Sequence, residues 1–154
     1  MNIIFLDVDG VLNSTNNLVE VSKRNKRPYS GYDYPFDMIC ILNLVYLVIF
    51  TDSRIVITST WRKDEIGKNV LLNELRKYDL DNRVIGYTRI LHNREEEIKD
   101  YLRSMDIPIR FIILDDDSDF DELKDYLIQT DYHTGLSFDD AEEGIKRLTD
   151  CKKK

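Results

Sequence analysis

The sequence is poor in the residues that build disulfide-rich, disordered or membrane-embedded proteins. Among its 154 residues are two cysteines, three prolines and six glycines. Cys40 and Cys151 are too few for a disulfide framework and have no metal-ligand spacing, which indicates a reducing compartment. The longest nearly apolar run, at residues 38–50, is shorter than the roughly 20 residues of a membrane-spanning helix. With no signal peptide at its start, we expect a cytoplasmic protein with no membrane segment.

Positive charge is also scarce. The chain has 22 lysines and arginines against 29 acidic residues, a formal net charge of −7. This balance argues against broad, non-specific attraction to nucleic acid, although it allows a local basic patch. Apolar residues (42%) and charged residues (33%) occur in proportions typical of a soluble globular protein. The length predicts a single domain over residues 1–150, followed by a basic tail at residues 151–154.

What the sequence does contain is an alternation of short apolar runs and helical patterns. Continuous β-branched and aromatic runs predict buried parallel strands. They lie at residues 3–6, 55–58 and 111–114, with weaker candidates at 84–87 and near Tyr132 and His133. Helical spacing predicts helices at residues 38–50, 64–77, 94–104, 120–128 and 138–148, and residues 13–34 form a polar loop. We therefore expect an α/β fold, a Rossmann-like three-layer sandwich with a mostly parallel sheet.

Acidic and hydroxyl side chains follow the three main predicted strands. The first strand is followed by Asp-Val-Asp-Gly at residues 7–10, the second by Ser-Thr-Trp-Arg at 59–62 and the third by three aspartates at 115–117. Ligands of such sheets collect beyond the carboxyl ends of the strands, so these groups should converge. Carboxylates brought together repel each other unless a cation intervenes, and a hard oxygen-ligand set suits Mg²⁺. Ordinary loop acids are the alternative, but two clusters directly after apolar strands make coincidence a poor explanation.

The first of these segments resembles the opening motif of the haloacid dehalogenase (HAD) superfamily. Its sequence, FLDVDGVL at residues 5–12, is similar to the DxDGxx pattern that follows an apolar strand in HAD phosphatases. Residues 55–59 look like the second motif and residues 111–116 like the fourth. Arg94 fits the third, a lone basic residue at the start of the helix before the last strand. The resemblance implies a HAD-like fold.

Two further segments narrow the resemblance. Ser-Thr-Trp-Arg at residues 59–62 and Thr-Gly-Leu-Ser at 134–137 resemble the HAD domain of Swiss Army Knife RNA repair proteins, which is similar to the phosphatase domain of polynucleotide kinase-phosphatase. Only a short segment separates Gly10 from the second strand, so a large inserted cap cannot fit. We therefore expect a minimal cap and an open site.

The resemblance implies roles for individual residues. Asp7 would attack phosphorus to form an aspartyl-phosphate, and Asp9 would protonate the leaving oxygen and then activate water. Positions i and i+2 start on the same side of a strand, so both carboxylates can face one phosphate. Ser59 would bind a phosphate oxygen, with Thr58 or Thr60 as the alternative. Arg94 would neutralise the phosphate charge and orient Asp7, with Arg89 as the alternative.

The same resemblance implies a Mg²⁺ site at the acidic strand ends. Its ligands would be the Asp7 carboxylate, the Asp9 backbone carbonyl and Asp116, while Asp115 would contact the basic residue. Because three acids are adjacent at residues 115–117, the register of this pair stays open by one position. The cofactor expected is therefore Mg²⁺.

Substrate-binding residues are expected around this site. Thr60 and Arg62 lie beside Ser59 and would help to shape the phosphate pocket. Residues 22–32 combine four cations with two tyrosines and no acid, a composition that suits a phosphate backbone and stacked bases. A solvated loop is the alternative for this segment. The four cations are Lys23, Arg24, Lys26 and Arg27.

The function that these features predict is Mg²⁺-dependent hydrolysis of phosphomonoesters. The expected partner is a phosphate-ester substrate, and our first choice is a nucleic-acid end that carries a 3′-phosphate. Nucleotides, small metabolites and phosphoproteins are alternative substrates. A catalytically idle HAD-like binding module is the alternative of a different class. The sequence indicates no protein partner.

Overall fold

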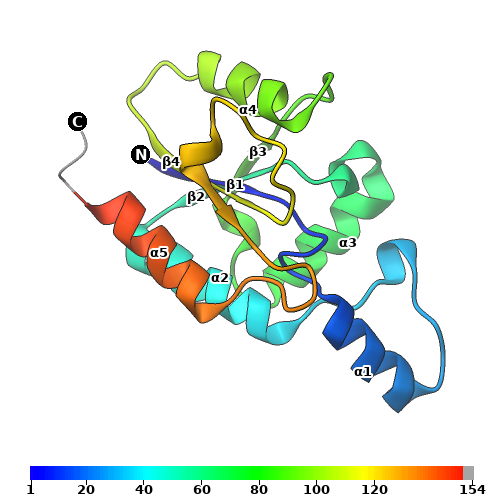
Figure 1. Ribbon diagram of the computed structural model, residues 1–154. Coiled ribbons are helices and arrows are strands. Elements are labelled where there is room, and N and C mark those ends of the chain that lie inside the picture. The colour runs from blue at the N-terminus through cyan, green and yellow to red at the C-terminus, as the bar shows by residue number, and fades with distance from the viewer. Residues whose placement is uncertain (151–154) are drawn as a thin grey trace.

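A five-stranded parallel sheet organises the computed structural model, which describes residues 1–150 (Figure 1). The strand order is β3-β2-β1-β4-β5, and every neighbouring pair is parallel. The strands are β1 (Asn2–Leu6), β2 (Arg54–Ile57), β3 (Val84–Tyr87), β4 (Arg110–Asp115) and β5 (Leu127–Gln129). Since β1 occupies the centre, the residues that follow it lie in the middle of the carboxyl edge. The predicted α/β, Rossmann-like architecture is confirmed.

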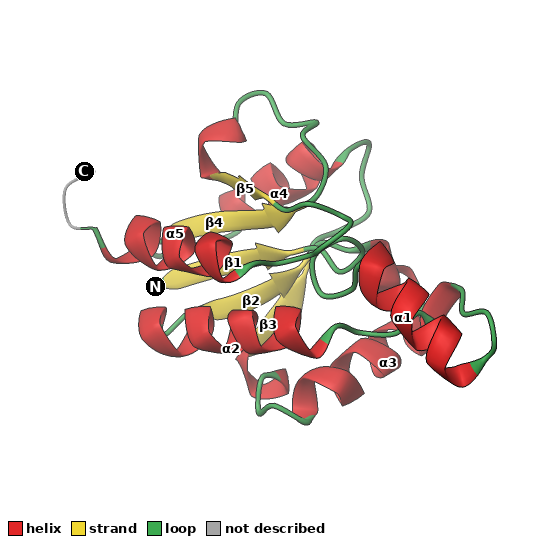
Figure 2. Ribbon diagram, turned by 60° about the horizontal axis from the view of Figure 1, so that its bottom comes forward, coloured by secondary structure: helices red, strands yellow, loops and turns green. Residues whose placement is uncertain are grey.

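Helices cover both faces of this sheet (Figure 2). One face carries α2 (Met38–Thr51), α3 (Glu65–Arg76) and α5 (Phe138–Thr149), and the opposite face carries α4 (Arg94–Arg103). Successive residues of β1 alternate between the two cores, because side chains of a strand point to opposite faces: Ile4 and Leu6 belong to the first core, Ile3 and Phe5 to the second. Burial on both faces explains why this strand is continuously apolar.

Side-chain caps define where these four helices begin. The capping residues are Asp37, Asp64, Asn93 and Ser137, and each accepts a hydrogen bond from a backbone N–H of the first turn. Ser137 forms a reciprocal capping box with Asp140. The sequence predictions for α2, α3, α4 and α5 are confirmed to within one residue at each end. On α5, Gly144 allows close packing against α2, because an added Cβ would lie 2.9 Å from Leu47 Cδ1.

Two predictions near the last strands are wrong. Residues 120–128 do not form a helix but a 3₁₀ turn (Lys124–Tyr126) followed by β5. The fifth strand therefore lies before Tyr132 and His133, where the structure has only an isolated bridge between Asp131 and Gly135. Phe120 and Leu123 nevertheless pack into the core on the α4 side of the sheet. These two buried residues are three positions apart, and this spacing resembles one face of a helix in the sequence.

The segment predicted as a polar loop, residues 13–34, contains the helix α1 (Thr15–Asn25). No side chain of α1 is buried, so no apolar stripe announces it. Its start is set by Ser14, whose side chain accepts from Asn17 N–H, and its end by Lys26 in a left-handed conformation. A 3₁₀ turn at Gly31–Asp33 follows. Together these residues project past the carboxyl ends of the strands (Figure 2).

No helix within residues 1–150 is long and apolar enough to cross a bilayer. Cys40 is buried and free, whereas Cys151 and the predicted basic tail at residues 151–154 lie outside the described residues.

A buried arginine ties the loops after β2 and β3 to α4. Arg62 is 5% exposed, and its Nη2 lies 2.7 Å from Glu97 Oε2 on α4. Its remaining N–H groups donate to backbone carbonyls, those of Thr58, Ser59, Thr88 and Arg89. A guanidinium has five N–H donors, so each one has a protein acceptor. This network fixes the backbone just after β2 and just after β3, at the carboxyl edge where the site begins.

Replacing Glu97 by Gln removes the only carboxylate paired with this buried guanidinium among residues 1–150. Because an uncompensated buried charge is strongly unfavourable, we expect the free energy of unfolding to fall by about 3–5 kcal/mol, measured by urea denaturation. Glu122→Gln is the matched control: its ion pair with Lys99 has Glu122 76% exposed, and its loss should cost less than about 1 kcal/mol. Equal costs for the two variants would contradict this account of Arg62.

Candidate active site

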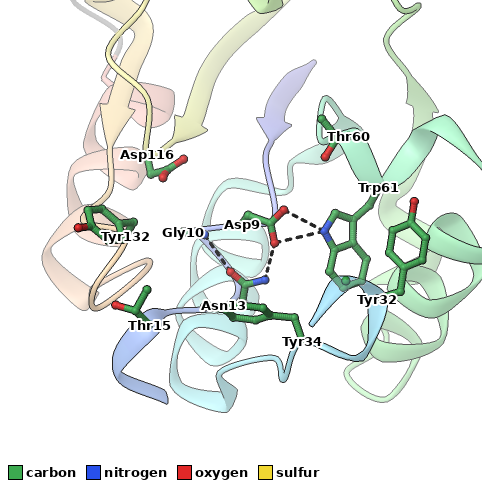
Figure 3. Close-up of a pocket in the computed structure, with 11 residues that line it drawn as sticks. Asp9, Gly10, Asn13, Thr15, Tyr32, Tyr34, Thr60, Trp61, Asp116 and Tyr132 are labelled. Atoms are coloured by element: carbon green, nitrogen blue, oxygen red, sulfur yellow. Dashed lines mark hydrogen bonds between the residues drawn. The ribbon is translucent and has the colours of Figure 1, made fainter. Parts of the chain in front are cut away.

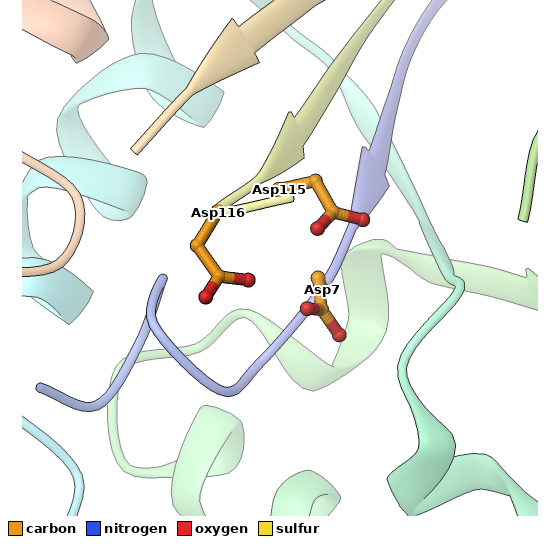
Figure 4. Close-up of side chains that lie close together, drawn as sticks. All are labelled: Asp7, Asp115 and Asp116. Carbon is orange, nitrogen blue, oxygen red and sulfur yellow. The ribbon is translucent and has the colours of Figure 1, made fainter. Parts of the chain in front are cut away.

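Three carboxylates meet at the carboxyl edge of the sheet (Figure 4). Asp7 follows β1, Asp115 ends β4 and Asp116 comes next, and one oxygen from each lies within 4.8 Å of the others. The register explains this, because Leu6 pairs with Leu114 and the following residues therefore lie side by side. The carboxylates that follow β1 and end β4 thus converge as their places at the strand ends predicted.

Burial makes this cluster electrostatically costly. Burial and the nearby Asp7 carboxylate raise the pKa of Asp115 to about 7. Burial also raises the pKa of Asp7, although the Arg94 guanidinium acts in the opposite direction, and it raises the pKa of Asp116. Additional positive charge nearby would therefore favour the ionised form of all three groups.

The donor set fits a hard divalent cation. Both Asp115 oxygens are already engaged, Oδ2 by Arg94 and Oδ1 by the backbone N–H of Asp117. Asp7 and Asp116 are left as the carboxylates with free oxygen lone pairs, which is the ligand type that Mg²⁺ prefers. These are the positions that the sequence suggested for the metal.

Arg94 is the basic residue that reaches the cluster. It opens α4 directly after the capping residue Asn93, and its Nη1 lies 3.3 Å from Asp7 Oδ1 while forming an ion pair with Asp115. The alternative, Arg89, pairs instead with Asp100 and has a side chain that is 73% exposed. Of the two arginines weighed from the sequence, only Arg94 contacts the carboxylates.

Asp9 lies beside this cluster but is held by other partners (Figure 3). Its exposed carboxylate accepts hydrogen bonds from Trp61 Nε1 at 3.1 and 3.2 Å and from Asn13 Nδ2 at 2.7 Å. In the sequence Trp61 stands out only as part of the Ser-Thr-Trp-Arg segment at residues 59–62, and Asn13 is not singled out. Nothing in the local pattern identifies Asn13, because its role depends on the turn that brings it back to Asp9.

Gly10 allows the turn after Asp9 to approach the acidic cluster. Its φ of 76° is in the left-handed region, and an added Cβ would lie 2.6 Å from the carboxyl carbon of Asp116. The backbone N–H of Gly10 donates to Asn13 Oδ1, and its carbonyl accepts from Thr130 Oγ1. A side chain at this position would displace Asp116.

The three hydroxyl residues after β2 differ in access. Ser59 is fully buried and its Oγ accepts from the backbone N–H of Trp61, which caps the turn Thr60–Lys63. Thr58 is also buried, and its hydroxyl has no hydrogen-bond partner within residues 1–150. Thr60 is exposed and lines both cavities described below. Ser59 is therefore the hydroxyl already committed to the backbone.

The predicted substrate-binding arginines and lysines differ in their relation to the carboxylates, because Arg62 lines the smaller cavity beside them whereas the cations of residues 22–32 do not. Arg62 is buried, and each of its N–H groups already has a protein acceptor, so its contribution there is positive charge and support of the backbone. Arg27 pairs with Asp33 and lies over the ring of Tyr29. None of the four cations of residues 22–32 lines either cavity. Three of them are exposed at the end of α1, namely Lys23, Arg24 and Lys26.

Two cavities flank the carboxylates. The smaller, about 280 Å³, is lined by Asp7, Arg94 and Asp115 among others. The larger, about 550 Å³, is lined by Asp9 and by aromatic side chains. Thr60 and Asp116 belong to both, so the two spaces meet beside the acidic cluster.

Comparison with known proteins agrees with this geometry. A family model described as the HAD domain in Swiss Army Knife RNA repair proteins matches residues 3–141, from β1 into α5. Searches of curated proteins and of solved structures found no match. The matched stretch contains Asp7, Asp9, Arg94, Asp115 and Asp116. The chain therefore belongs to the HAD domain family of Swiss Army Knife RNA repair proteins and has the fold of a HAD-type phosphatase.

Proposed function

We propose that the protein is a Mg²⁺-dependent phosphomonoesterase that forms a phosphoryl bond to Asp7 and acts on nucleic-acid ends. The observation that carries the proposal is the position of Asp7, buried between Arg94 and the two acids at the end of β4, Asp115 and Asp116. A carboxylate held in this way is oriented by a guanidinium and shielded from water. Family membership supports the phosphatase class of the reaction.

The reaction proceeds in two displacements at phosphorus. In the first, a carboxylate oxygen of Asp7 attacks, the bond to the ester oxygen breaks and Asp9 donates a proton to the leaving oxygen. In the second, Asp9 takes a proton from water, the water oxygen attacks phosphorus and the bond to Asp7 breaks. Phosphate is released and both aspartates return to their starting states. Trp61 and Asn13 keep the Asp9 carboxylate at the border of the larger cavity, where a leaving group would lie.

Asp7, Asp116 and the Asp9 backbone carbonyl are the groups that would hold Mg²⁺. The ion supplies positive charge that offsets the clustered carboxylates and the phosphate. Arg94 contributes a second, fixed positive charge and pairs with Asp115. Thr60, exposed at the meeting point of the two cavities, is the accessible hydroxyl for a phosphate oxygen.

The nucleic-acid part of the proposal has two supports. The matched family is described as belonging to RNA repair proteins. In addition, Lys23, Arg24 and Lys26 form an exposed basic end of α1, which starts beside the larger cavity at Thr15. Such cations suit contacts with backbone phosphates beyond the reacting end.

The direct test is phosphate release from a 3′-phosphorylated oligonucleotide with Mg²⁺, compared with a phosphopeptide and a free nucleotide. Asp7→Asn should lower turnover by at least about 10³-fold, because the attacking carboxylate is lost. Its circular dichroism spectrum and unfolding midpoint should show a folded protein. Asp125→Asn, at an exposed site in the turn before β5, is the matched control and should keep wild-type turnover.

Two outcomes of this test would count against the proposal. Wild-type turnover of the phosphopeptide or nucleotide with none of the oligonucleotide would reject the polymer substrate. Full activity of Asp7→Asn would reject the covalent mechanism.

The second prediction compares substitutions of Arg94 and Arg89. Arg94→Ala should lower kcat by about 10²–10³-fold, because a positive charge that stabilises the transition state is removed. Arg89→Ala removes an exposed arginine from an ion pair with Asp100 and should change kcat less than about twofold. Steady-state kinetics on one substrate compare the two variants. Similar losses for both would remove Arg94 from the mechanism.

The third prediction concerns metal binding and pH. The raised pKa of Asp115 means that, in the metal-free protein, the stability linked to this group is present at low pH and is lost as pH rises through about 7. Mg²⁺ offsets the repulsion that appears when the proton leaves. The increase in melting temperature on adding Mg²⁺ should therefore be larger at about pH 8 than at about pH 5.

Differential scanning fluorimetry with Mg²⁺ and with EDTA measures this increase. Asp116→Asn should reduce it at both pH values, because a metal ligand is lost. An increase that is independent of pH would contradict the assignment of the metal to these carboxylates.

A further inference from the structure

The larger cavity has an aromatic lining that the two displacement steps do not use. Four aromatic side chains line it, from the segment after α1, the turn after β2 and the segment after β5 (Figure 3). They are Tyr32, Tyr34, Trp61 and Tyr132. Four aromatic side chains beside the acidic cluster favour a ligand with a flat, apolar surface.

Two of these side chains form a fixed wall. Tyr32 donates its hydroxyl to Asp64 Oδ2 at 2.5 Å, and its ring meets Trp61 edge-on with centroids 5.2 Å apart. Trp61 is further held by Phe36, at 5.3 Å between centroids, and by its hydrogen bonds to Asp9. Gly67 on α3 makes room for this wall, since an added Cβ would lie 2.8 Å from the Tyr32 ring.

The other two tyrosines are positioned partly by backbone hydrogen bonds. Tyr34 N–H donates to Gly31 O, and the Tyr132 carbonyl accepts from Thr15 N–H, both at 3.1 Å. Neither hydroxyl makes a hydrogen bond within residues 1–150. The Tyr132 side chain is also on the surface, since the residue is 51% exposed. The Tyr132 ring also lies against the His133 ring, with centroids 3.9 Å apart, and Tyr34 is partly buried against the core. Both tyrosines still line the cavity, so each presents part of its side chain to a ligand there.

The two cavities divide a phosphate ester between them. A phosphate bound beside Asp7 and Arg94 occupies the smaller cavity, and Asp9 stands at the border with the larger one. The group attached to the leaving oxygen then enters the aromatic cavity. The volume of the aromatic cavity, about 550 Å³, is in the range of pockets that bind small organic ligands.

Charge restricts what this group can be. The lining contains two carboxylates, Asp9 and Asp116, and no lysine or arginine. A second phosphate or a carboxylate in this space would be repelled, whereas a neutral group is accepted. A nucleoside is neutral and has a π-face that stacks on tyrosine whatever its base.

We propose that the aromatic cavity binds the terminal nucleoside of the phosphorylated strand, stacked against Tyr34 and Tyr132. These two tyrosines determine specificity, while Tyr32 and Trp61 form the rigid wall. The inference rests on the phosphatase function proposed above for Asp7. It adds that recognition of one nucleoside, before any contact with the basic end of α1, separates nucleic-acid ends from other phosphate esters.

Kinetics on two substrates test the proposal. One is a nucleoside 3′-monophosphate and the other is glycerol phosphate, which has the same ester but no base. In Tyr34→Leu and Tyr132→Leu, the ratio of kcat/KM for the nucleotide to kcat/KM for glycerol phosphate should fall about 5- to 100-fold, mainly through KM. Tyr34→Phe and Tyr132→Phe keep the stacking face and should retain most of the wild-type ratio. Tyr126→Leu, exposed and outside both cavities, should leave the ratio unchanged.

A binding measurement keeps the proposal independent of turnover. Trp61 is the single tryptophan of the chain and lines the cavity, so its fluorescence reports occupancy. In Asp7→Asn, the nucleoside 3′-monophosphate should change this fluorescence, and adding either leucine substitution should weaken binding at least about 5-fold.

The two proposals fail in different ways. Binding without turnover in the wild type would reject the phosphatase function and leave the nucleoside cavity standing. Turnover with an unchanged substrate ratio in both leucine variants, or no fluorescence response to the nucleotide, would overturn the nucleoside cavity.

Discussion

The site depends on the balance between three crowded carboxylates and one guanidinium. Asp7, Asp115 and Asp116 extend from two adjacent strands in register, so the backbone brings their charges together whether or not the charges attract. Arg94 offsets only part of this charge. The remaining repulsion, strengthened by burial, is what makes the edge of the sheet a place for a divalent cation and a phosphate. The fold therefore holds uncompensated negative charge at this edge, and a bound cation would neutralise it.

Other contacts keep this arrangement from relaxing. Arg62 joins the backbone after β2 and β3 to Glu97 on α4, which is the helix that presents Arg94. Gly10 lets the turn after β1 pass against Asp116 without a side chain between them. Each of these residues acts through the backbone of a neighbouring segment. The carboxylates and Arg94 consequently face each other across a rigid frame.

Sequence reasoning succeeded where one strand or helix decides the outcome. The apolar strands predicted where Asp7 and Asp115 would emerge, because parallel strands share one carboxyl edge. It failed where tertiary contacts decide. Residues 120–128 place apolar side chains at i, i+3, i+7 and i+8, which mimics a helix, although the segment ends in the short strand β5. The N–H groups of Arg62 all have acceptors, several of them in distant segments. The hydrogen bonds from Trp61 and Asn13 to Asp9 likewise depend on tertiary contacts, which local sequence spacing does not reveal.

The helix α1 is attached to this frame without being part of either core. Hydrogen bonds at its first turn attach it to the segments around Phe36 and Tyr132, and none of its side chains is buried, so most of its surface residues can be exchanged at little cost to folding. The architecture thus separates the sheet and its acidic cluster, which carry the chemistry, from α1, whose surface can vary. Substitutions in this one short helix could therefore change which molecules the protein contacts without altering the groups at the acidic cluster.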